Sequence, residues 1–300
     1  MKICITAANC FIGMPLVKKA SSLGCNVTAV VRVGNKQKEY LGSIPNVNVI
    51  ELNLEDYGKL GSLVKSVDCA VLLTWNGTRG QTRLDEKLQE SNYFYNMKAV
   101  KSLVKHGCKR IITAGSQAEY GICNDVITEK TECNPNTAYG KYKVKLFQDA
   151  SKYCYTHGVS LKEPRFFSLY GPGDYKNTLI MSNIYKMISN DECNMTPCSQ
   201  MWDYLYIDDA INGVIKLCTK ECLDGAYNFG SGDCRPLKEF VNEMKQILQS
   251  KSELKFGTVP YTPAGVVSIQ PNIEKLRSTG WEPKVSFGQG IKNIVKTLEK

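Results

Sequence analysis

The sequence predicts an α/β fold with a doubly wound parallel sheet, and three observations support this prediction. Short apolar runs typical of strands alternate with segments whose apolar residues recur at helical spacing. Glycines end the helical segments, at Gly24, Gly107 and Gly158. The chain has 300 residues, of which 43% are hydrophobic, so it can bury a large core. Strands that alternate strictly with helices pair in parallel and are covered on both faces.

The N-terminal part of the chain supplies the first three strands and the first helix. Residues 2–6 (KICIT) form a short apolar run typical of a strand. Apolar residues then recur every three or four positions over 12–23, which indicates a helix ending before Gly24. Two further apolar runs, at 26–31 and 47–52, are expected to form the second and third strands.

The same alternation continues to residue 167. A helical segment over 60–67 precedes an apolar run at 69–73. A long helix is expected over 84–106, because helical spacing persists until Gly107. The remaining elements expected in this sheet are a strand at 110–114, a helix at 139–157 and a strand at 159–167. After Tyr170 the pattern changes to loops and short elements, so a second, smaller lobe is expected to start there.

The net charge is +9, and the basic residues that produce it are scattered along the chain. The densest basic cluster, residues 105–110, lies beside a strand that should be buried, whereas nucleic-acid-binding proteins usually concentrate basic residues on one face. A positive surface suits a small anionic substrate equally well. The longest apolar runs are far too short to span a membrane, and Met1-Lys2 leads directly into a strand rather than a signal peptide. We therefore expect neither a nucleic acid nor a membrane as partner.

The cysteines do not form a recognisable metal or redox motif. There are thirteen, and no two have C-x-x-C spacing. In a chain that is neither small nor secretory, this usage indicates reduced thiols. We expect a cytoplasmic protein with no metal site.

The stretch ITAANCFIG, residues 5–13, lies between the first strand and the first helix. At this position a dinucleotide-binding fold holds the cofactor pyrophosphate on the N-terminus of the helix, in a glycine-rich turn. Here only Gly13 is a glycine, while Ala7 and Cys10 stand in place of the other two. A thiol at a helix N-terminus is expected to have a lowered pKa. On this stretch alone, a cofactor loop and an ordinary turn both remain open.

Three later segments favour the cofactor loop. AYGKYK, residues 138–143, places Tyr139 and Lys143 on one face of a helix. AGSQAEYG, starting at residue 114, puts Ser116 just past the carboxyl end of a strand, where α/β sheets bind ligands. RFFSLYGPGD, residues 165–174, leaves the last strand through a Gly-Pro-Gly turn.

With these segments the sequence resembles the extended short-chain dehydrogenase/reductase family, the sugar-nucleotide epimerases and dehydratases. The resemblance runs over nearly the full length. It includes WDYLYIDDA at 202–210, YNFGSG at 227–232 and GWEPKVSFGQGI at 280–291. By this resemblance, ITAANCFIG is the family's cofactor loop with two glycines replaced.

The resemblance implies a Rossmann-type fold with two functional parts. Residues 1–167, joined by parts of 201–232, are expected to bind the dinucleotide, and residues 168–300 to form mainly the substrate-binding lobe. Cofactor contacts are expected along the carboxyl ends of the strands. The residues implied are Thr6, Asn9, Cys10, Phe11, Ile12, Arg32, Asn53, Leu54, Leu73, Thr74, Asn92, Tyr139, Lys143 and Phe166.

Ser116, Tyr139 and Lys143 are the expected catalytic residues. A free phenol has a pKa near ~10 and is a poor base at neutral pH, but a neighbouring ammonium favours the phenolate. Lowering this pKa by about three units needs roughly 4 kcal/mol, which Lys143 and an oxidised nicotinamide ring can supply together. Tyr139 is then the proton donor or acceptor at a sugar hydroxyl or carbonyl, and Ser116 hydrogen-bonds the same oxygen. The resemblance adds that Lys143 holds the nicotinamide ribose.

The choice of cofactor depends on the end of the second strand. An acidic residue there binds the ribose 2′-hydroxyl of NAD, whereas an arginine accommodates the extra phosphate of NADP. In VVRVGNK, Arg32 takes this place, Lys36 is close by, and the stretch contains no Asp or Glu. NADP(H) is therefore favoured, with NAD(H) as the other possibility.

Two missing acids narrow the reaction class. By resemblance, the 4,6-dehydratases carry Asp and Glu directly after the catalytic Ser or Thr, and the decarboxylases also need that Glu. Here Gln117 and Ala118 occupy these positions, and Glu119 comes one residue too late and should face differently. The reactions left are reduction of a nucleotide-linked 4-keto-6-deoxy sugar with NADPH, which Arg32 favours, and NAD-dependent 4-epimerisation.

A hypothesis from another class is a nucleotide-binding sensor without turnover. The altered glycine loop supports it, whereas an intact Ser116, Tyr139 and Lys143 oppose it. The family often dimerises through the two helices that carry Asn92 and Tyr139, so a homodimer is expected.

Four residues are expected to contact the substrate. Trp202 stands where the family has an arginine that binds the nucleotide diphosphate, and it either stacks on the substrate or packs in the core. Ser168 replaces a family asparagine that faces the substrate. Trp75 follows the fourth strand and is expected to line the sugar-binding site. Gln117 directly follows the catalytic serine.

Overall fold

The computed structural model describes residues 1–261 and 267–299 and consists of two compact units. Unit 1 contains residues 1–121, 131–166 and 211–227, and unit 2 contains residues 122–130, 167–210 and the described part of 228–300. The sequence-based boundary had left 122–130 in the first domain. The structure places this segment in unit 2 because Ile127 forms a parallel bridge with Pro271 and exchanges backbone hydrogen bonds with Gln270 and Asn272.

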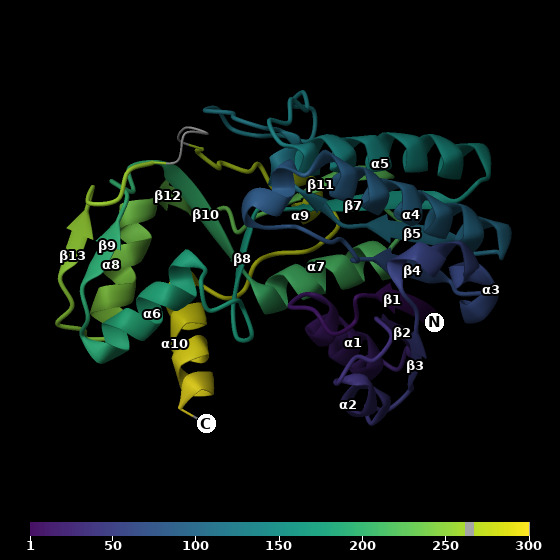
Figure 1. Cartoon of the computed structure of the whole chain (residues 1–300), viewed down its shortest axis with the longest axis horizontal. Helices are drawn as coiled ribbons and strands as arrows, with labels where there is room; N and C mark the ends of the chain where they lie inside the picture. Colours follow the sequence, from purple (N-terminus) through teal and green to yellow (C-terminus); the bar gives the residue numbers. More distant parts are fainter. Residues whose placement is uncertain (262–266, 300) are drawn as a thin grey trace. The chain divides into compact units, whose positions relative to one another are not determined.

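Unit 1 is built on an eight-stranded sheet (Figure 1). The strand order is β11-β7-β5-β4-β1-β2-β3, with β6 paired to β7. The pairs from β3 through β7 are parallel, which confirms the predicted doubly wound sheet. The strands are β1 (Lys2–Thr6), β2 (Asn26–Val31), β3 (Val47–Glu51), β4 (Cys69–Leu72), β5 (Arg110–Thr113), β6 (Gly115–Ser116), β7 (Ser160–Phe166) and β11 (Gly225–Phe229).

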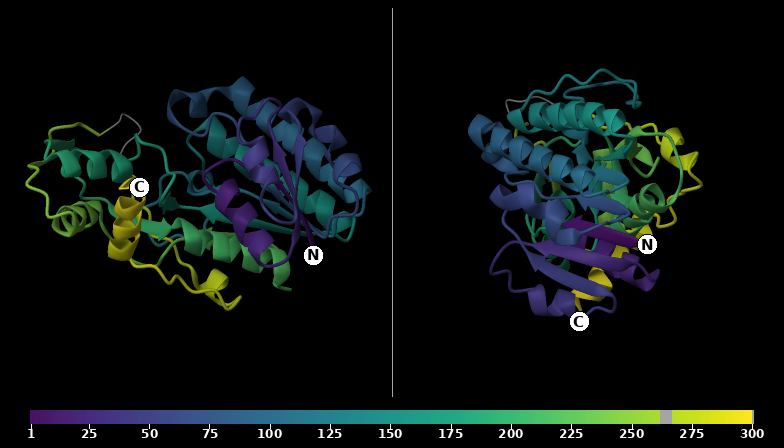
Figure 2. Two further views of the ribbon diagram at one scale, coloured as in Figure 1. Left: turned by 90° about the horizontal axis from the view of Figure 1, so that it is seen from below. Right: turned by 90° about the vertical axis from the view of Figure 1, so that its right-hand side faces the viewer.

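Helices cover both faces of this sheet. Figures 1 and 2 show α4 and α5 side by side on one face and α1 with most of α7 on the other. The Asp85 carboxylate accepts the Leu88 N–H at the start of α4, and the Thr137 hydroxyl accepts the Gly140 N–H at the start of α5. The helical elements are α1 (Gly13–Ser22), α2 (Lys38–Gly42), η1 (Leu54–Lys59), α3 (Leu60–Val64), η2 (Gly80–Leu84), α4 (Glu86–Lys105), η3 (Gln117–Glu119), α5 (Ala138–Thr156) and α7 (Ile207–Thr219).

Most element bounds agree with the sequence-based expectation to within two residues. Two differences concern short helices. The helix expected over 60–67 ends at Val64 and is preceded by the 3-10 turns of η1, from Leu54. The five-residue helix α2 was not predicted, because so short a segment shows no helical periodicity.

The carboxyl ends of the central strands are tied together at Thr6. Its buried hydroxyl oxygen accepts the N–H groups of Leu73 (2.9 Å) and Thr74 (3.2 Å), just past the end of β4. The Thr74 hydroxyl lies 2.6 Å from the Tyr57 hydroxyl. This edge, at which open α/β sheets bind ligands, is thereby fixed in position.

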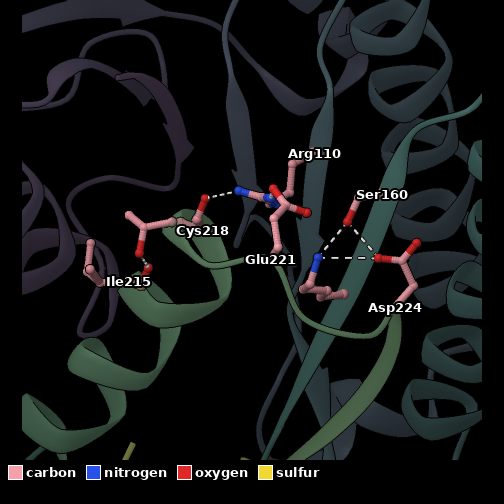
Figure 3. A network of polar contacts seen from close by, with 8 residues as sticks. Arg110, Ser160, Ile215, Cys218, Glu221 and Asp224 are labelled. Atoms are coloured by element: carbon pink, nitrogen blue, oxygen red, sulfur yellow. Dashed lines mark hydrogen bonds and ion pairs between the residues drawn. The ribbon is translucent and has the colours of Figure 1, made fainter. Parts of the chain in front are cut away.

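A polar network at the opposite end of β5 and β7 joins residues 211–227 to the sheet (Figure 3). Arg110 in β5 donates to the Cys218 carbonyl oxygen and pairs with Glu221. Lys162 in β7 is fully buried, and its ammonium pairs with Asp224 at 3.3 Å. The network explains why this later segment belongs to unit 1 (Figure 3).

The described residues of unit 2 form two small sheets and four helices. One sheet has the order β12-β10-β8, and β13 pairs with β9 in the other. Aromatic rings fill its core, with Tyr204 packed against Tyr170, Phe240 and Phe287. Its elements are β8 (Ser168–Tyr170), α6 (Leu179–Ser189), β9 (Cys193–Met195), β10 (Met201–Tyr206), β12 (Cys234–Pro236), α8 (Leu237–Ile247), β13 (Leu254–Phe256), α9 (Glu274–Arg277) and α10 (Phe287–Leu298). Within 1–261 and 267–299, no helix has both the length and the apolar character needed to cross a membrane.

Candidate active site

Strand β6 and helix α5 bring Ser116, Tyr139 and Lys143 together in unit 1. Tyr139 and Lys143 lie one turn apart on α5, and both side chains are buried. The Ser116 side chain lies beside the Tyr139 phenol and acts to lower its pKa. Its hydroxyl oxygen also accepts the Ala118 N–H at 3.2 Å, which caps the short turn η3. The three residues that the sequence assigned to catalysis therefore form one cluster.

The Lys143 ammonium is held by a carbonyl and an aromatic ring. Its Nζ donates to the Ala114 carbonyl oxygen at 2.6 Å and lies 3.8 Å from the Trp75 ring centroid. Burial lowers the pKa of Lys143 to about 8, although Glu119 and Glu163 act in the opposite direction. Lys143 is thus charged at neutral pH but close to its titration.

Tyr139 is a protonated phenol at neutral pH. Burial raises the pKa of Tyr139, and the Ser116 side chain and the charge of Arg83 only partly offset this effect. The Lys143 ammonium lies 5.8 Å from the Tyr139 ring centroid. The chain by itself therefore does not produce the lowered pKa expected from the sequence, and the positive nicotinamide ring included in that expectation would have to supply the shift. A phenol in this state is suited to donating a proton.

A buried ionic network packs against β6, the strand that carries Ser116. Glu119 accepts the Ser116 N–H at 2.7 Å, and the Arg165 guanidinium pairs with Glu119 (2.8 Å) and Glu163 (3.1 Å). Glu119 therefore faces inward, toward this network. A Cβ at Gly115 would lie 2.7 Å from Glu163 Cγ, so only glycine fits between the network and Ser116. Burial and the nearby Glu119 raise the pKa of Glu163 well above its usual range.

Sequence reasoning missed Glu163 and Arg165. The sequence did contain a signal for these two residues. A strand that is otherwise buried carries two opposite charges, and buried charges need partners. Their partner Glu119 could not be identified, since the pairing depends on how η3 folds back over β7.

Two buried amides fix the segment that follows β4. The Gln89 side chain accepts the Trp75 indole N–H at 2.6 Å and donates to the Gly77 carbonyl at 2.9 Å. The Asn92 amide accepts the Asn76 N–H (2.9 Å) and donates to the Asn76 carbonyl (2.8 Å). Asn92 therefore orders this segment in the structure, and a direct cofactor contact remains a prediction.

The turn between β1 and α1 is where the sequence places a dinucleotide pyrophosphate. Helix α1 starts after Ile12 without a cap from the Ile12 side chain, but its first N–H groups are already used. The Gly13 N–H donates to Cys10 Sγ, the Met14 N–H donates to the Cys10 carbonyl, and Pro15 has no N–H. An anion would therefore have to be held by N–H groups of the turn before the helix. A Cβ at Gly13 would lie 2.3 Å from the Ala7 carbonyl oxygen, which explains the retained glycine. Ala7 has a φ of 48°, the left-handed conformation that glycine adopts without strain. The turn therefore keeps the shape of a glycine-rich loop.

Cys10 corrects one expectation. Its Sγ accepts the Gly13 N–H at 3.2 Å, and backbone hydrogen bonds favour the thiolate. Burial is nevertheless the larger effect and raises the pKa of Cys10, so the predicted lowering is wrong. The thiol lies over the first turn of α1 as a weak, neutral acceptor.

Arg32 lies exposed after β2, and a carboxylate from the neighbouring strand reaches the same loop. The Arg32 guanidinium donates to Asn76 Oδ1 at 3.1 Å. Glu51, at the end of the neighbouring strand β3, accepts the Gly34 N–H at 2.8 Å and pairs with Lys38. The sequence of this loop, VVRVGNK, contains no acidic residue that would disfavour a 2′-phosphate. Glu51 was not expected here because it belongs to another strand.

The remaining residues expected at the cofactor line the same edge of the sheet. Asn53 accepts the Val33 N–H at 3.3 Å, and Leu54 and Phe166 are buried. Asn9, Phe11 and Ile12 are partly exposed in the turn before α1, and Leu73 and Thr74 are partly exposed after β4. Their contacts with a cofactor remain predictions.

The residues expected at the substrate lie in both units. Trp75 and Gln117 belong to unit 1, where the Trp75 ring meets Tyr139 edge-on at 6.2 Å. Ser168 and Trp202 lie on the paired strands β8 and β10 of unit 2, and Trp202 packs 6.3 Å from Tyr204. Among residues 1–261 and 267–299 there is no group of three His, Cys, Asp or Glu side chains suited to a metal ion.

A family model and several curated proteins match the chain. The model of the NAD dependent epimerase/dehydratase family matches residues 3–230. CDP-abequose synthase of Salmonella muenchen is 23% identical over 99% of this chain and 98% of its own length. dTDP-6-deoxy-L-talose 4-dehydrogenase (NAD(+)) of Aggregatibacter actinomycetemcomitans is 26% identical over 87% of this chain and 95% of its own. dTDP-4-dehydro-6-deoxyglucose reductase of Escherichia coli is 25% identical over 69% of this chain and 67% of its own.

Solved structures share the fold over the whole chain. The UDP-glucose 4-epimerase of Thermotoga maritima, solved with UDP-glucose, superposes with a TM-score of 0.89 at 20% identity, covering 100% of this chain and 99% of that one. The UDP-glucose 4-epimerase of Thermus thermophilus, solved with NAD, gives 0.87 at 17% identity with the same coverage.

Proposed function

The chain belongs to the NAD dependent epimerase/dehydratase family, and we propose that it reduces a nucleotide-linked 4-keto-6-deoxy sugar with NADPH. One observation carries the proposal: Tyr139 is a buried phenol with a raised pKa, and the Ser116 side chain lies beside it. Such a group holds a proton at neutral pH and can donate it to a carbonyl oxygen.

In this proposal the bound cofactor supplies the hydride that reduces the sugar carbonyl carbon. Ser116 hydrogen-bonds the carbonyl oxygen, and the Tyr139 hydroxyl gives it the proton that completes the alcohol. The Ala114 carbonyl and the Trp75 ring fix the position of the Lys143 ammonium. Its positive charge favours the Tyr139 phenolate that remains after the proton has left.

The acidic residues argue against dehydration and decarboxylation. Gln117 and Ala118 occupy the positions of the family's dehydratase acids, and the Glu119 carboxylate is committed to the Ser116 N–H and Arg165. No carboxylate of η3 is therefore free to remove water from a sugar. The names of two relatives, a 4-dehydro-6-deoxyglucose reductase and a 6-deoxytalose 4-dehydrogenase, support redox chemistry at the sugar 4-position.

A second candidate is an NAD-dependent 4-epimerase, and Glu51 favours it. Its carboxylate lies at the loop after β2 and would repel a 2′-phosphate, unless Lys38 neutralises it. Arg32 supports the preference for NADP(H), because its exposed guanidinium matches a phosphate. We therefore propose NADP(H) as the cofactor, with attraction of the 2′-phosphate by Arg32 outweighing its repulsion by Glu51.

The proposal includes a cytoplasmic homodimer. The thirteen cysteines are all free thiols, which suits a reducing compartment. On the outer surfaces of α4 and α5, Phe94 is 49% and Tyr155 87% exposed, which suits burial against a second copy. Sedimentation of the purified protein and of Phe94→Glu tests the dimer, since a charge in that interface should release the monomer.

The proposed reaction is tested by absorbance with CDP-, dTDP- and UDP-linked 4-keto-6-deoxy sugars and either NADPH or NADH. We expect NADPH oxidation that requires one of these sugars. Tyr139→Phe should reduce turnover by at least about a hundredfold, the lower range for general acid–base catalysis. Tyr142→Phe, on the same helix but outside the cluster, is the matched control. Interconversion of 4-epimers without net NADPH consumption would establish the epimerase instead.

A further inference from the structure

The segment between β4 and α4 places a second cation on the reacting phenol. The guanidinium carbon of Arg83, in η2, lies 4.9 Å from the centroid of the Tyr139 ring. Arg83 Nε is buried and makes no hydrogen bond within the described residues. Burying a polar nitrogen without a hydrogen-bond partner lowers the stability of the fold. That Arg83 is nevertheless kept beside the proton donor indicates a functional role.

The position of Arg83 is fixed from α4. The Gln89 side chain, fully buried, donates to the carbonyl oxygens of Gly77 (2.9 Å) and Thr82 (2.8 Å). Asp85 caps α4 directly after η2. These contacts hold both ends of 77–82, so Arg83 emerges over Tyr139 in a defined position.

We propose that Arg83 is a positioning residue that stabilises the phenolate formed when Tyr139 gives up its proton. In that step the Tyr139 O–H bond breaks, a new O–H bond forms on the sugar oxygen, and the negative charge stays on the phenol. A guanidinium keeps its charge at every working pH, so Arg83 attracts this negative charge throughout. The inference deepens the proposed function and rests on it.

The charges around Tyr139 explain why a second cation is useful. Glu119 in η3 and Glu163 in β7 disfavour the phenolate, whereas Ser116 in β6 and Arg83 favour it. Lys143 on α5 is committed to the Ala114 carbonyl and Trp75. Arg83 lies nearer to the Tyr139 ring centroid (4.9 Å) than the Lys143 ammonium does (5.8 Å), and no hydrogen bond within the described residues engages its Nε.

The test measures the titration of Tyr139 itself and needs no substrate. 3-Fluorotyrosine is placed at position 139, and fluorine NMR follows its ionisation in the parent, Arg83→Met and Arg83→Lys. We expect Arg83→Met to raise the midpoint by about one pH unit, the effect of losing an opposite charge within ~4–6 Å. Arg83→Lys should restore part of the shift. Lys87→Met, which removes an exposed charge from the first turn of α4, should leave the midpoint unchanged.

Kinetics with the accepted sugar then separate the roles of Arg83. We expect Arg83→Met to lower kcat more than it changes KM. An unchanged midpoint, or the absence of any titration in the parent, overturns the inference. A rise in KM with an unchanged midpoint would instead make Arg83 a substrate ligand. Because the titration is independent of turnover, failure of the reductase proposal leaves this test intact.

Discussion

The Lys143 ammonium lies 3.8 Å from the centroid of the Trp75 ring, while its Nζ donates to the Ala114 carbonyl at 2.6 Å. The indole face attracts the cation, by about 2 kcal/mol where water is excluded. Burial acts against this attraction and lowers the pKa of Lys143 to about 8. The charged state of Lys143 thus depends on an aromatic residue that the sequence had assigned to the sugar.

Trp75→Leu should weaken the charged form of Lys143. We expect its pKa to fall by about one unit, because one unit corresponds to about 1.4 kcal/mol. The charged lysine is the working form and is lost as pH rises through its pKa. The alkaline fall of kcat/KM should therefore move to lower pH, with a smaller shift in Trp75→Phe, which keeps an aromatic ring. Identical alkaline limbs in the parent and Trp75→Leu would show that the indole does not control Lys143.

Cofactor preference should respond oppositely to two changes near the end of β2. Arg32 is expected to pair with the 2′-phosphate through hydrogen bonds worth about 1.5–3 kcal/mol each, so NADPH should bind roughly ten- to a hundredfold more tightly than NADH. Arg32→Gln should abolish this preference. Glu51→Gln should increase it, because the carboxylate beside the Gly34 N–H is lost.

Fluorescence titration of both cofactors measures these preferences. Lys59→Gln, a change at an exposed lysine of η1, controls for the loss of a positive charge. Equal affinities for NADPH and NADH in the parent would make Arg32 a turn residue and favour the epimerase.

Restoring the glycines of the cofactor loop should tighten binding. Ala7→Gly relieves a left-handed alanine, and Cys10→Gly frees the Gly13 N–H from the thiol. We expect the double variant to stay folded and to gain about 1 kcal/mol in cofactor binding, roughly fivefold in Kd. Cys10→Gly costs about 0.4–1 kcal/mol of stability through the unfolded chain, whereas at position 7 the relief of the left-handed alanine offsets this cost. Weaker binding measured by calorimetry would contradict a family-type loop.

The Cys10 thiol should react slowly at neutral pH. Burial raises the pKa of Cys10, so alkylation should accelerate as the pH increases. Bound dinucleotide should protect it, whereas Cys222, outside the cofactor loop, should react equally with and without cofactor. Mass spectrometry of the labelled peptides gives both rates. Equal rates at Cys10 with and without dinucleotide would place the cofactor elsewhere.

The two buried glutamates behind Ser116 should differ in their effect on stability. Burial and Glu119 raise the pKa of Glu163, which makes its neutral form easier to reach, so the neutral Glu163→Gln should cost less stability than Glu119→Gln. Glu119→Gln removes the charge that pairs with Arg165 and should destabilise the fold by about 3–5 kcal/mol. Urea unfolding of both variants measures the difference. Equal losses would mean that Glu163 is also ionised.

The sequence predicted the parallel sheet and the cluster of Ser116, Tyr139 and Lys143, because both follow from local patterns. Alternating periodicities determine the order of strands and helices, and i, i+4 spacing places the tyrosine and lysine on one helix face. The carboxyl ends of parallel strands share one edge, which brings Ser116 to that helix.

The contacts that tune these residues were not predictable in the same way. Arg83 lies over Tyr139 where Gln89 holds the preceding loop, and Glu51 reaches the loop after β2 from the neighbouring strand β3. Both contacts join residues that are distant in sequence. The pKa of Cys10 was mispredicted because burial, which depends on the whole fold, exceeds the local effect of the helix N-terminus.

The most direct measurement follows the hydride in the proposed reduction. The protein is incubated with a nucleotide-linked 4-keto-6-deoxy sugar and NADPH deuterated at both nicotinamide C4 positions, and the product is analysed by mass spectrometry and NMR. We expect one deuteron at sugar C4 for each NADPH oxidised, and loss of this product in Tyr139→Phe but not in Tyr142→Phe. Epimerised sugar without deuterium, or an equal rate in Tyr139→Phe, would contradict the proposed reduction.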